Sequence, residues 1–488
     1  MYDVAVVGFG PVGAVLANLL GAMGVRCVVL EREAGTYHLP RAVHFDDEVM
    51  RVFQSVGLAR AVEGITHASP GMRFVNAEGR LLIDWPRPAG EGPLGWHRSY
   101  RFHQPDLELV LREGVARFSC VAVRTRCEVL DIEQDAEGAL LAVVDHAAGV
   151  RERVAARFVV GCDGARSLVR RLVGTEMEDL HARQQWLVTD LVLNRAKPEL
   201  GDFSVQHCDP ARPSTYVRGT GMRRRWEIML MPGDDPALAG EAATVWRWLA
   251  RWIGPEEAAI ERAAVYTFHA AIARAWRWGR LLIAGDAAHL TPPFLGQGMC
   301  AGVRDVANLA WKLRAVLGGA PEGLLDSYGR ERVAHVRDYI EIAVRLGRVI
   351  QETDPAAARA RDIRMAARPE LMRSPAPRLG GHEGRAEPAG RISPQPRLAD
   401  GRLLDDAVGH RFAVVMRADF AGSVSRAEYS ALEEAGAVVV VEDGAAVLGW
   451  LDEVGAPAVV LRPDRYVLGW GGDMAALLGL LRLETVAH

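Results

Sequence analysis

The chain has 488 residues and a mass of 53.2 kDa, which predicts about three domains, because a single hydrophobic core rarely serves more than 250–300 residues. Hydrophobic residues make up 49% and charged residues 25%, which excludes a disordered or fibrous chain. The formal net charge is −4, so no overall positive field exists to hold nucleic acid or anionic lipid. All basic residues except Lys197 and Lys312 are scattered arginines.

The cysteines and the apolar segments indicate where the protein resides. None of the six cysteines has C-x-x-C spacing and none lies in the last third of the chain, so no disulfide framework is expected. The chain opens on a strand-like run, which leaves no room for a signal peptide, and no apolar stretch reaches the 18 residues of a membrane span. We therefore expect a cytoplasmic protein without a membrane span or a metal site.

The first 31 residues predict a parallel β-α-β unit. A strand over residues 4–7 leads into Gly8-Phe9-Gly10-Pro11-Val12-Gly13, a helix follows over 14–24, and a second strand over 27–30 ends at Glu31. The glycines permit a sharp turn, close approach of a pyrophosphate and close helix packing, and the helix N-terminus favours phosphate. Glu31 lies where a carboxylate accepts ribose hydroxyls. This combination predicts a dinucleotide site.

The middle of the chain predicts two further strands of the same sheet and a separate sheet. Residues 157–161 and 280–285 are strand runs that each end in glycine and aspartate. Between them, residues 176–272 carry β-type segments such as 186–193 and 226–231. The triplet Arg223-Arg224-Arg225 before the second segment is typical of a turn.

The last third predicts helices, a connection and a small α/β domain. Apolar residues recur at helical spacing over 302–318, and another helical stretch covers 322–366. Prolines and glycines without an apolar period mark 369–400 as a linker. Beyond it, strands are predicted at 412–416, 438–441, 458–461 and 466–470, with a helix after each except the third.

A second motif favours FAD over NAD as the bound dinucleotide. Gly285-Asp286 ends a strand, and Pro292-Pro293-Phe294-Leu295-Gly296-Gln297-Gly298 precedes a helix. An aspartate after a strand can bind a ribityl hydroxyl, which a nicotinamide coenzyme lacks. The following helix N-terminus favours negative charge on a reduced flavin.

Together these motifs resemble the class A flavoprotein aromatic hydroxylases, which are single-component FAD monooxygenases, and among them the 3-(3-hydroxyphenyl)propionate hydroxylase group. The motif at 162–167 also carries the resemblance, which covers residues 1–370 and is dense in 40–48, 104–108 and 285–313. The C-terminal domain resembles the thioredoxin-like tail of some members.

The resemblance implies an α/β fold with a Rossmann-like FAD-binding domain, an inserted β-sheet substrate domain and a C-terminal thioredoxin-like α/β domain without cysteines. The implied divisions are 1–175 and 273–368 for the FAD-binding domain, 176–272 for the substrate sheet, 369–400 for the linker and 401–488 for the tail.

The resemblance also implies roles for individual residues. Glu31 would bind the adenosine ribose, Arg41 would lie beside the pyrophosphate, Gln104 would contact the ribityl chain, and Asp163 with Arg166 would serve both FAD and a passing NAD(P)H. The complete implied set, for a tightly but non-covalently bound FAD, is Gly8, Gly10, Pro11, Val12, Gly13, Glu31, Arg32, Arg41, Gln104, Asp163, Asp286, Pro293, Gly296, Gln297, Gly298 and Met299.

The implied activity is hydroxylation of a phenolic or related aromatic substrate with NAD(P)H and dioxygen, through a C4a-hydroperoxyflavin. Such chemistry requires exclusion of water and removal of a phenolic proton. The candidate proton-handling residues are His207, Tyr216, Tyr266 and His269, and those for a substrate carboxylate are Arg212 and Arg218. On a strand, Tyr266 and Phe268 share one face and His269 lies on the other. His289 is expected to support the flavin loop.

Two other classes of function remain open. One is a different flavoenzyme on the same scaffold, such as an epoxidase or a prenyl-chain reductase. The other is a non-catalytic FAD-binding protein whose tail recruits partners. A homodimer is one expected assembly. P-loop, G-x-S-x-G and H-E-x-x-H motifs are absent from the sequence.

Overall fold

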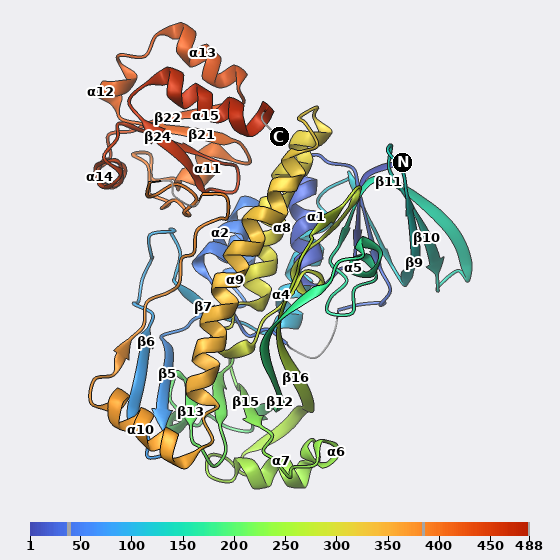
Figure 1. Cartoon of the computed structure of the whole chain (residues 1–488), viewed down its shortest axis with the longest axis vertical. Coiled ribbons are helices and arrows are strands. Elements are labelled where there is room, and N and C mark those ends of the chain that lie inside the picture. Colours follow the sequence, from blue (N-terminus) through green and yellow to red (C-terminus); the bar gives the residue numbers. More distant parts are fainter. Residues whose placement is uncertain (37–40, 383–385, 487–488) are drawn as a thin grey trace.

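The computed structural model describes residues 1–36, 41–382 and 386–486, with the last four as backbone. Pro40, which belongs to one of the motifs above, lies outside the described residues. Figure 1 shows the N-terminal sheet beside the long helices, the second sheet below them and the C-terminal segment above. No helix in the described part of the chain combines the length and apolar character that a membrane span needs.

The N-terminal sheet has eight strands and contains the predicted β-α-β unit. β1 lies between β2 and β11 and is parallel to both, and β18 is parallel to β11, so the strand runs expected near 157–161 and 280–285 are confirmed. The path is β17-β18-β11-β1-β2-β8, and β9 and β10 extend it as antiparallel strands. Its strands are β1 (Tyr2–Val7), β2 (Cys27–Glu31), β8 (Val121–Thr125), β9 (Cys127–Gln134), β10 (Ala139–Asp145), β11 (Val150–Gly161), β17 (Arg277–Trp278) and β18 (Leu281–Ile283).

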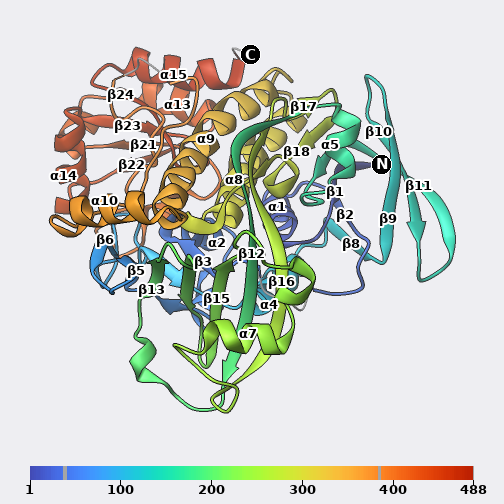
Figure 2. The same cartoon turned by 60° about the horizontal axis from the view of Figure 1, so that its bottom comes forward.

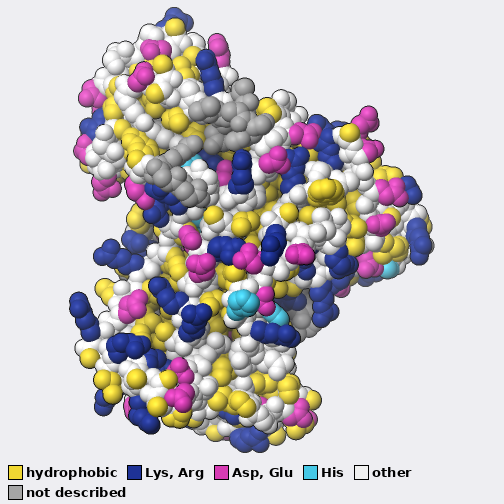
Figure 3. All heavy atoms as spheres, in the orientation of Figure 1, with side chains coloured by type: hydrophobic (Ala, Val, Ile, Leu, Met, Phe, Trp, Pro, Cys, Tyr) yellow, Lys and Arg dark blue, Asp and Glu magenta, His cyan; other side chains and the backbone are white. Residues whose placement is uncertain are grey.

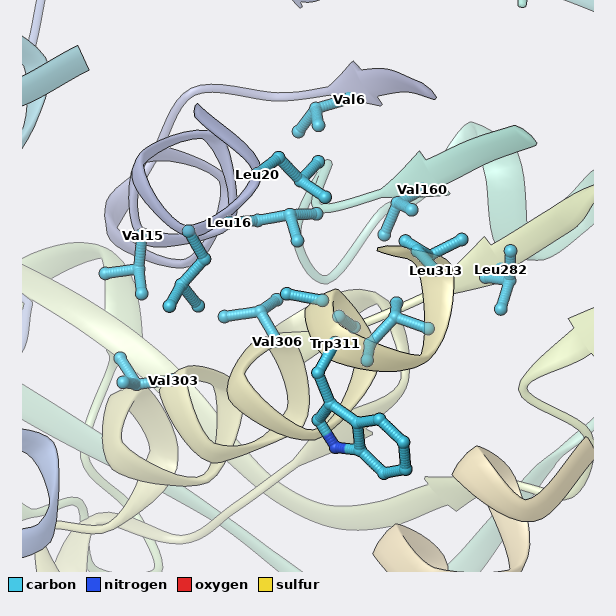
Figure 4. Close-up of a cluster of buried hydrophobic side chains, with 14 of the residues drawn as sticks. Val6, Val15, Leu16, Leu20, Val160, Leu282, Val303, Val306, Trp311 and Leu313 are labelled. Carbon is cyan, nitrogen blue, oxygen red and sulfur yellow. The ribbon is translucent and has the colours of Figure 1, made fainter. Parts of the chain in front are cut away.

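Two helices cover one face of this sheet and form its core. Val15, Leu16 and Leu20 of α1 (Pro11–Ala22) pack with Val303 and Val306 of α8 (Gly298–Leu317), all fully buried (Figure 4). Burial of each such side chain stabilises the fold by about 1.5–3 kcal/mol. The glycine turn and the late helix therefore meet over the same sheet although some 290 residues separate them.

The second sheet has nine strands and draws on more of the chain than 176–272. Its order is β19-β16-β12-β15-β14-β13-β5-β6-β20, and Figure 2 brings it forward below the helices. The strands are β5 (Gly71–Asn76), β6 (Leu81–Pro86), β12 (Met177–Leu193), β13 (Ser204–Cys208), β14 (Ser214–Arg218), β15 (Arg223–Met229), β16 (Ala258–Ala273), β19 (His289–Leu290) and β20 (Glu370–Leu371). A small third sheet joins β3 (His44–Asp46), β7 (Ser99–Arg101) and β4 (His67–Ala68).

The prediction of a turn at Arg223-Arg224-Arg225 is wrong, because these residues begin β15. Arg224 and Arg225 are buried. A charged residue is stable there because Asp190, on the neighbouring strand β12, is the register partner of Arg225 and forms an ion pair with it. A buried arginine in a strand requires such a partner.

The helical stretch expected over 322–366 is divided into α9 (Leu324–Ile350) and α10 (Pro355–Ala366). Pro355 stands at the first position of α10, where its missing N–H is not needed, and the Asp354 side chain accepts hydrogen bonds from the Ala356 and Ala357 amides. The other helices are α2 (Asp47–Ser55), α3 (Ala59–Glu63), α4 (Gln104–Val115), α5 (Leu168–Val173), α6 (Pro236–Ala239) and α7 (Ala242–Leu249), with 3₁₀ turns at Pro198–Leu200, Gly285–Ala287 and Pro293–Leu295.

The C-terminal segment forms a four-stranded sheet with helices on both faces. The order is β22-β21-β23-β24, with β21 parallel to β22 and antiparallel to β23. Val414 and Met416 pack on the side of α13 and α15, whereas Ala413 and Val415 pack on the side of α11 and α14. Its elements are α11 (Leu404–Val408), β21 (Phe412–Met416), α12 (Ala418–Ala421), α13 (Arg426–Glu434), β22 (Ala437–Val441), α14 (Ala445–Val454), β23 (Ala458–Leu461), β24 (Val467–Gly471) and α15 (Met474–Val486).

The proline-rich stretch is packed along its described parts. β20 pairs with β6, and the Gly390 and Ser393 amides donate hydrogen bonds to the carbonyl oxygens of Val467 and Arg465. The segment thus contributes backbone contacts to both the second sheet and the C-terminal segment.

A buried ion cluster joins the C-terminal segment to the long helices. One oxygen of Glu331 on α9 accepts hydrogen bonds from Lys312 Nζ at 2.9 Å, Arg462 Nη2 at 2.7 Å and Asn308 Nδ2 at 2.7 Å. Burial alone would raise the pKa of the Glu331 carboxyl, but Arg462 and Lys312 hold this pKa well below its usual range. The carboxylate is therefore ionised and holds two buried cations together.

We predict that Glu331→Ala lowers the free energy of unfolding at pH 7 by about 3–5 kcal/mol, because it leaves two buried cations without their shared anion. Since the folded-state pKa of Glu331 lies below its unfolded value, the difference from wild type should be fully present at neutral pH and shrink as the pH falls below about 4.3.

Urea denaturation at several pH values measures this difference. Glu322→Ala is the control, because Glu322 is half-exposed in its pairs with Arg277 and Arg280 and should contribute less than about 1 kcal/mol. An equal loss for the two variants would contradict the prediction.

Candidate active site

A cavity of about 440 Å³ lies where the N-terminal sheet, the long helices and the second sheet meet. Its walls combine segments that are far apart in the sequence: the α1 N-terminus, the loop before β3, the turns between β18 and α8, and one face of the second sheet. The visible face of the molecule elsewhere shows interspersed basic and acidic side chains (Figure 3).

The glycine turn after β1 is constrained by close backbone contacts. A Cβ atom on Gly13 would lie 2.1 Å from the Gly8 carbonyl oxygen, and one on Gly8, whose φ is +99°, would lie 2.5 Å from the Cys162 carbonyl oxygen. A Cβ on Gly10, in contrast, would meet no atom within 4 Å. Gly10 precedes α1 without a side-chain cap, and Gly10, Pro11 and Val12 at the start of this helix line the cavity.

Glu31 and Arg32 lie beyond this turn and are not among the described residues that line the cavity. The two carboxylate oxygens of Glu31 accept hydrogen bonds from the Phe9 amide at 2.7 Å and the Glu33 amide at 2.8 Å. Glu31 therefore fixes the glycine turn directly. Arg32 is exposed and pairs with Glu33.

Gln104 holds the loop before β3, which forms another wall of the cavity. Its Oε1 accepts hydrogen bonds from the Arg41 amide at 2.8 Å and the Ala42 amide at 2.7 Å, and its Nε2 donates to Glu108 at 2.7 Å. Nearby, burial and Arg87 lower the pKa of His44 to about 4, so this cavity-lining imidazole is uncharged at neutral pH.

The turns between β18 and α8 are held from behind by Asp305. One of its carboxylate oxygens lies 3.1 Å from the Gly285 amide and 2.7 Å from His289 Nε2, and all three groups are buried. His289 thus supports the turn, as predicted. Asp286, Pro293, Gly296, Gln297, Gly298 and Met299 line the cavity. α8 also begins without a side-chain cap, and its first residues line the cavity, so a second helix N-terminus borders this space.

Asp163 caps helix α5. Its carboxylate accepts hydrogen bonds from the Ser167 hydroxyl and from the Leu168 and Val169 amides. Its neighbours Cys162 and Gly164 line the cavity, whereas the Arg166 side chain is exposed.

Side chains on the second sheet alternate between the cavity and a separate core. Gln206, Thr215, Glu227 and Val188 are register partners across four strands, and all four line the cavity. Tyr266 and Phe268 on β16 line it as well. Because strand side chains alternate, the residues between these positions point to the opposite face.

Three predicted proton-handling residues lie on that opposite face of the sheet and are not among the described cavity-lining residues. His207 lies 5.0 Å from the Trp252 ring, and burial together with Arg251 lowers its pKa to about 4. Tyr216 packs 5.0 Å from the Trp226 ring. His269 follows Phe268 on β16 and is the register partner of Arg183.

The two predicted carboxylate-binding arginines are separated. Arg218 lines the cavity, where it shares the carboxylate of Asp202 with Arg101 at 3.5 and 2.8 Å. Arg212 pairs with Asp234 at 2.7 Å, lies over the Trp248 ring and is not among the described lining residues.

The sequence analysis missed a cluster of charges in the cavity wall. Arg225 Nε and Arg262 Nη2 lie 2.7 and 2.6 Å from the two oxygens of Asp190, and Arg225 Nη1 donates a hydrogen bond to the Arg41 carbonyl at 2.6 Å. The cluster thus links the second sheet to the loop that Gln104 holds. The alternation of Arg223, Arg225 and Glu227 was the available signal, because it places three charges on one face of a strand.

Comparisons with known proteins identify the family of the chain. The family described as FAD binding domain matches residues 1–343. A probable NADH-specific resorcinol 4-hydroxylase of Rhodococcus jostii is 39% identical, with 99% of this chain and 94% of that protein covered. A 3-(3-hydroxy-phenyl)propionate/3-hydroxycinnamic acid hydroxylase of Mycobacterium sp. (strain KMS) is 35% identical, with 96% and 88% covered.

Solved structures show the same fold at lower sequence identity. The flavin-dependent monooxygenase PieE, in complex with FAD and substrate, superposes with a TM-score of 0.81 at 22% identity and covers 99% of both chains. Aklavinone-11 hydroxylase, in a ternary complex with FAD and aklavinone, gives 0.80 at 22% identity, again with 99% of both chains covered. From the family match and the curated relatives, we conclude that the chain belongs to the FAD-binding family of flavoprotein aromatic hydroxylases.

Proposed function

We propose that the protein is an FAD-dependent monooxygenase that uses NAD(P)H and dioxygen to hydroxylate a phenolic or related aromatic compound. The observation that carries this proposal is a cavity whose walls include the starts of α1 and α8, both without a side-chain cap, and one face of the second sheet. The names of the relatives support a phenol such as resorcinol or a hydroxyphenyl propionate.

We assign each of the predicted domains a separate role. Residues 1–175 and 273–368 would form a Rossmann-like FAD-binding unit, and 176–272 most of the substrate sheet, which β5, β6, β19 and β20 complete. Residues 369–400 would form a connection and 401–488 a thioredoxin-like unit. The strand order β22-β21-β23-β24, with β23 antiparallel to its neighbours, supports the last assignment. The cysteines all lie at or before Cys300, so thiol chemistry in that unit is excluded.

The residues around the cavity fit FAD. The open space in front of Gly10 admits a pyrophosphate, and the α1 amides with Arg41 and Asp286 would contact it and the ribityl chain. Glu31 would reach the adenosine ribose from the end of β2. Gln104 and the α8 N-terminus would hold the flavin end, where partial positive charge favours a reduced, anionic ring. When bound, FAD supplies the hydride acceptance and oxygen activation.

The second sheet would hold the aromatic substrate. Phe268, Val188 and Met72 offer apolar contacts, and Gln206 and Thr215 offer hydrogen bonds. Tyr266 is the candidate that we retain for handling the phenolic proton, and Arg218 the one for a substrate carboxylate, because both line the cavity. We assign no such role to His207, Tyr216, His269 or Arg212.

Purified protein loaded with FAD tests this function. Resorcinol or 3-(3-hydroxyphenyl)propionate should stimulate NADH oxidation together with oxygen uptake, and the product should contain one additional oxygen atom on the ring. A product that has gained only hydrogen would indicate a reductase, and an absence of stimulation by a panel of phenols would refute the proposal.

We predict that Gly10→Ala weakens FAD binding by about tenfold or more without unfolding the apoprotein. The new methyl group meets no protein atom, and the Gly10 φ of −70° suits alanine, but the methyl occupies the space in front of α1. FAD titration by fluorescence, with thermal unfolding of the apoprotein, measures both effects.

Gly449→Ala is the matched control, since its methyl group also meets no atom within 4 Å but lies on α14, far from the cavity. Unchanged FAD affinity in Gly10→Ala would contradict the placement of the pyrophosphate.

A second prediction concerns the transfer of the substrate's phenolic proton. Tyr266→Phe should lower kcat by about 10²-fold and change the substrate KM little, because it removes a hydroxyl that would act in proton transfer while the aromatic wall is kept. Steady-state kinetics with an oxygen electrode measures kcat and the substrate KM separately. Tyr216→Phe removes a hydroxyl on the opposite face of the sheet and should leave kcat within about twofold, so similar losses in both variants would refute the assignment.

A further inference from the structure

Tyr466 joins the C-terminal segment to the FAD-binding part of the molecule through its hydroxyl group. It lies between β23 and β24 and is buried. Its Oη lies 2.7 Å from Glu48 Oε1 and 3.2 Å from His335 Nε2. Glu48 belongs to α2 and His335 to α9, so one hydroxyl contacts two separate elements outside the C-terminal segment.

The contact with Glu48 continues to the start of α8. The other oxygen of Glu48 accepts a hydrogen bond from Arg304 Nε at 2.6 Å. Arg304 Nη1 donates to Gln297 Oε1 at 2.9 Å, and its Nη2 donates to Asp46 at 2.5 Å. Gln297 lines the cavity and immediately precedes α8.

The contact with His335 continues to the turn after β18. Arg332 Nη1 lies 2.9 Å from His335 Nδ1, and Arg332 Nε donates to Asp305 at 2.9 Å. Asp305 in turn binds the Gly285 amide and His289. The two chains of contacts thus reach the two loops that line the cavity beside Asp286 and Gln297.

The chemistry of the groups fixes the direction of these hydrogen bonds. Arginine only donates, so His335 Nδ1 accepts from Arg332 and Nε2 carries the proton. His335 then donates to Tyr466, and Tyr466 donates its own proton to Glu48. Burial and the adjacent Arg332 hold the pKa of His335 well below its usual range, so the imidazole stays neutral. Each group in this series therefore has one defined role.

We propose that Tyr466 is a positioning residue for FAD, and that the C-terminal segment contributes to the flavin site through this side chain. Its hydroxyl fixes the positions of the Glu48 and His335 side chains. Through Arg304 and Arg332, these side chains fix the start of α8 and the turn at Gly285. The inference rests on FAD binding in the cavity and is independent of which aromatic compound is hydroxylated.

Other contacts hold the C-terminal segment in place without touching the two chains. Asp405 pairs with Arg51 at 2.5 Å and with Arg465 at 3.0 Å, and Arg462 pairs with Glu331. Loss of the Tyr466 hydroxyl alone should therefore leave the segment docked. This separates a positioning role from a merely structural one.

The test compares Tyr466→Phe with two controls in the full chain without substrate. Tyr429→Phe removes another hydroxyl from the same segment, one that bonds the Ala421 carbonyl. Asp405→Asn weakens docking at the Arg51 contact. FAD affinity is measured by titration, and the environment of bound FAD by its visible absorption spectrum and reduction potential.

Tyr466→Phe should raise the Kd for FAD about tenfold, because it removes the hydrogen-bond partner of the buried Glu48 Oε1 and His335 Nε2 atoms, and should change the spectrum and potential of the bound flavin. Both controls should keep the wild-type Kd and spectrum. Unaltered Kd, spectrum and potential in Tyr466→Phe would overturn the proposal.

Equal changes in Asp405→Asn would also overturn the proposal, because they would show a general effect of undocking. If wild-type protein binds FAD but hydroxylates no phenol, the proposed function fails while this inference stands.

Discussion

The position of the cavity depends on the close packing of backbone between Gly8, Gly13 and Cys162. Neither glycine has room for a Cβ atom, so α1 can start directly above the ends of β1 and β11. The ends of adjacent parallel strands are where open α/β sheets bind ligands, because the following helices direct their N-termini there. α8 begins at the same place, and its packing against α1 keeps both N-termini on one cavity.

The second constraint is the pairing of buried charge. Arg304, Arg332 and Arg462 are almost completely buried, and each has a carboxylate within 3 Å. Arginine suits such sites because its guanidinium stays charged and donates to several acceptors at once. The loops around the cavity therefore rest on ion pairs whose geometry is specific, whereas the helices behind them rest on apolar packing. The chain's strong preference for arginine over lysine matches this use.

The sequence was sufficient to predict the turns after β1 and β18, but not which face of the second sheet lines the cavity. Glycine turns and the Asp286 motif have local signatures, since they depend on backbone conformation and residues a few positions apart. His207, Tyr216 and Tyr266, in contrast, differ only in which side of a strand they occupy, and that depends on the register of a nine-stranded sheet assembled from distant segments. The same holds for Arg225, whose burial makes sense only once Asp190 lies beside it. Strands β5 and β6 joined the sheet from outside 176–272, which no local pattern indicated.

The alternation of side chains between the two faces of the second sheet has a consequence for changing the substrate selectivity of the enzyme. The residues of its central strands that line the cavity lie mostly on one face, and residues on the opposite face build a separate apolar core with α7. Mutagenesis restricted to the ligand-facing set could therefore remodel selectivity while the packing beneath stays intact. That set includes Val188, Ser204, Gln206, Thr215, Val217, Glu227, Tyr266 and Phe268.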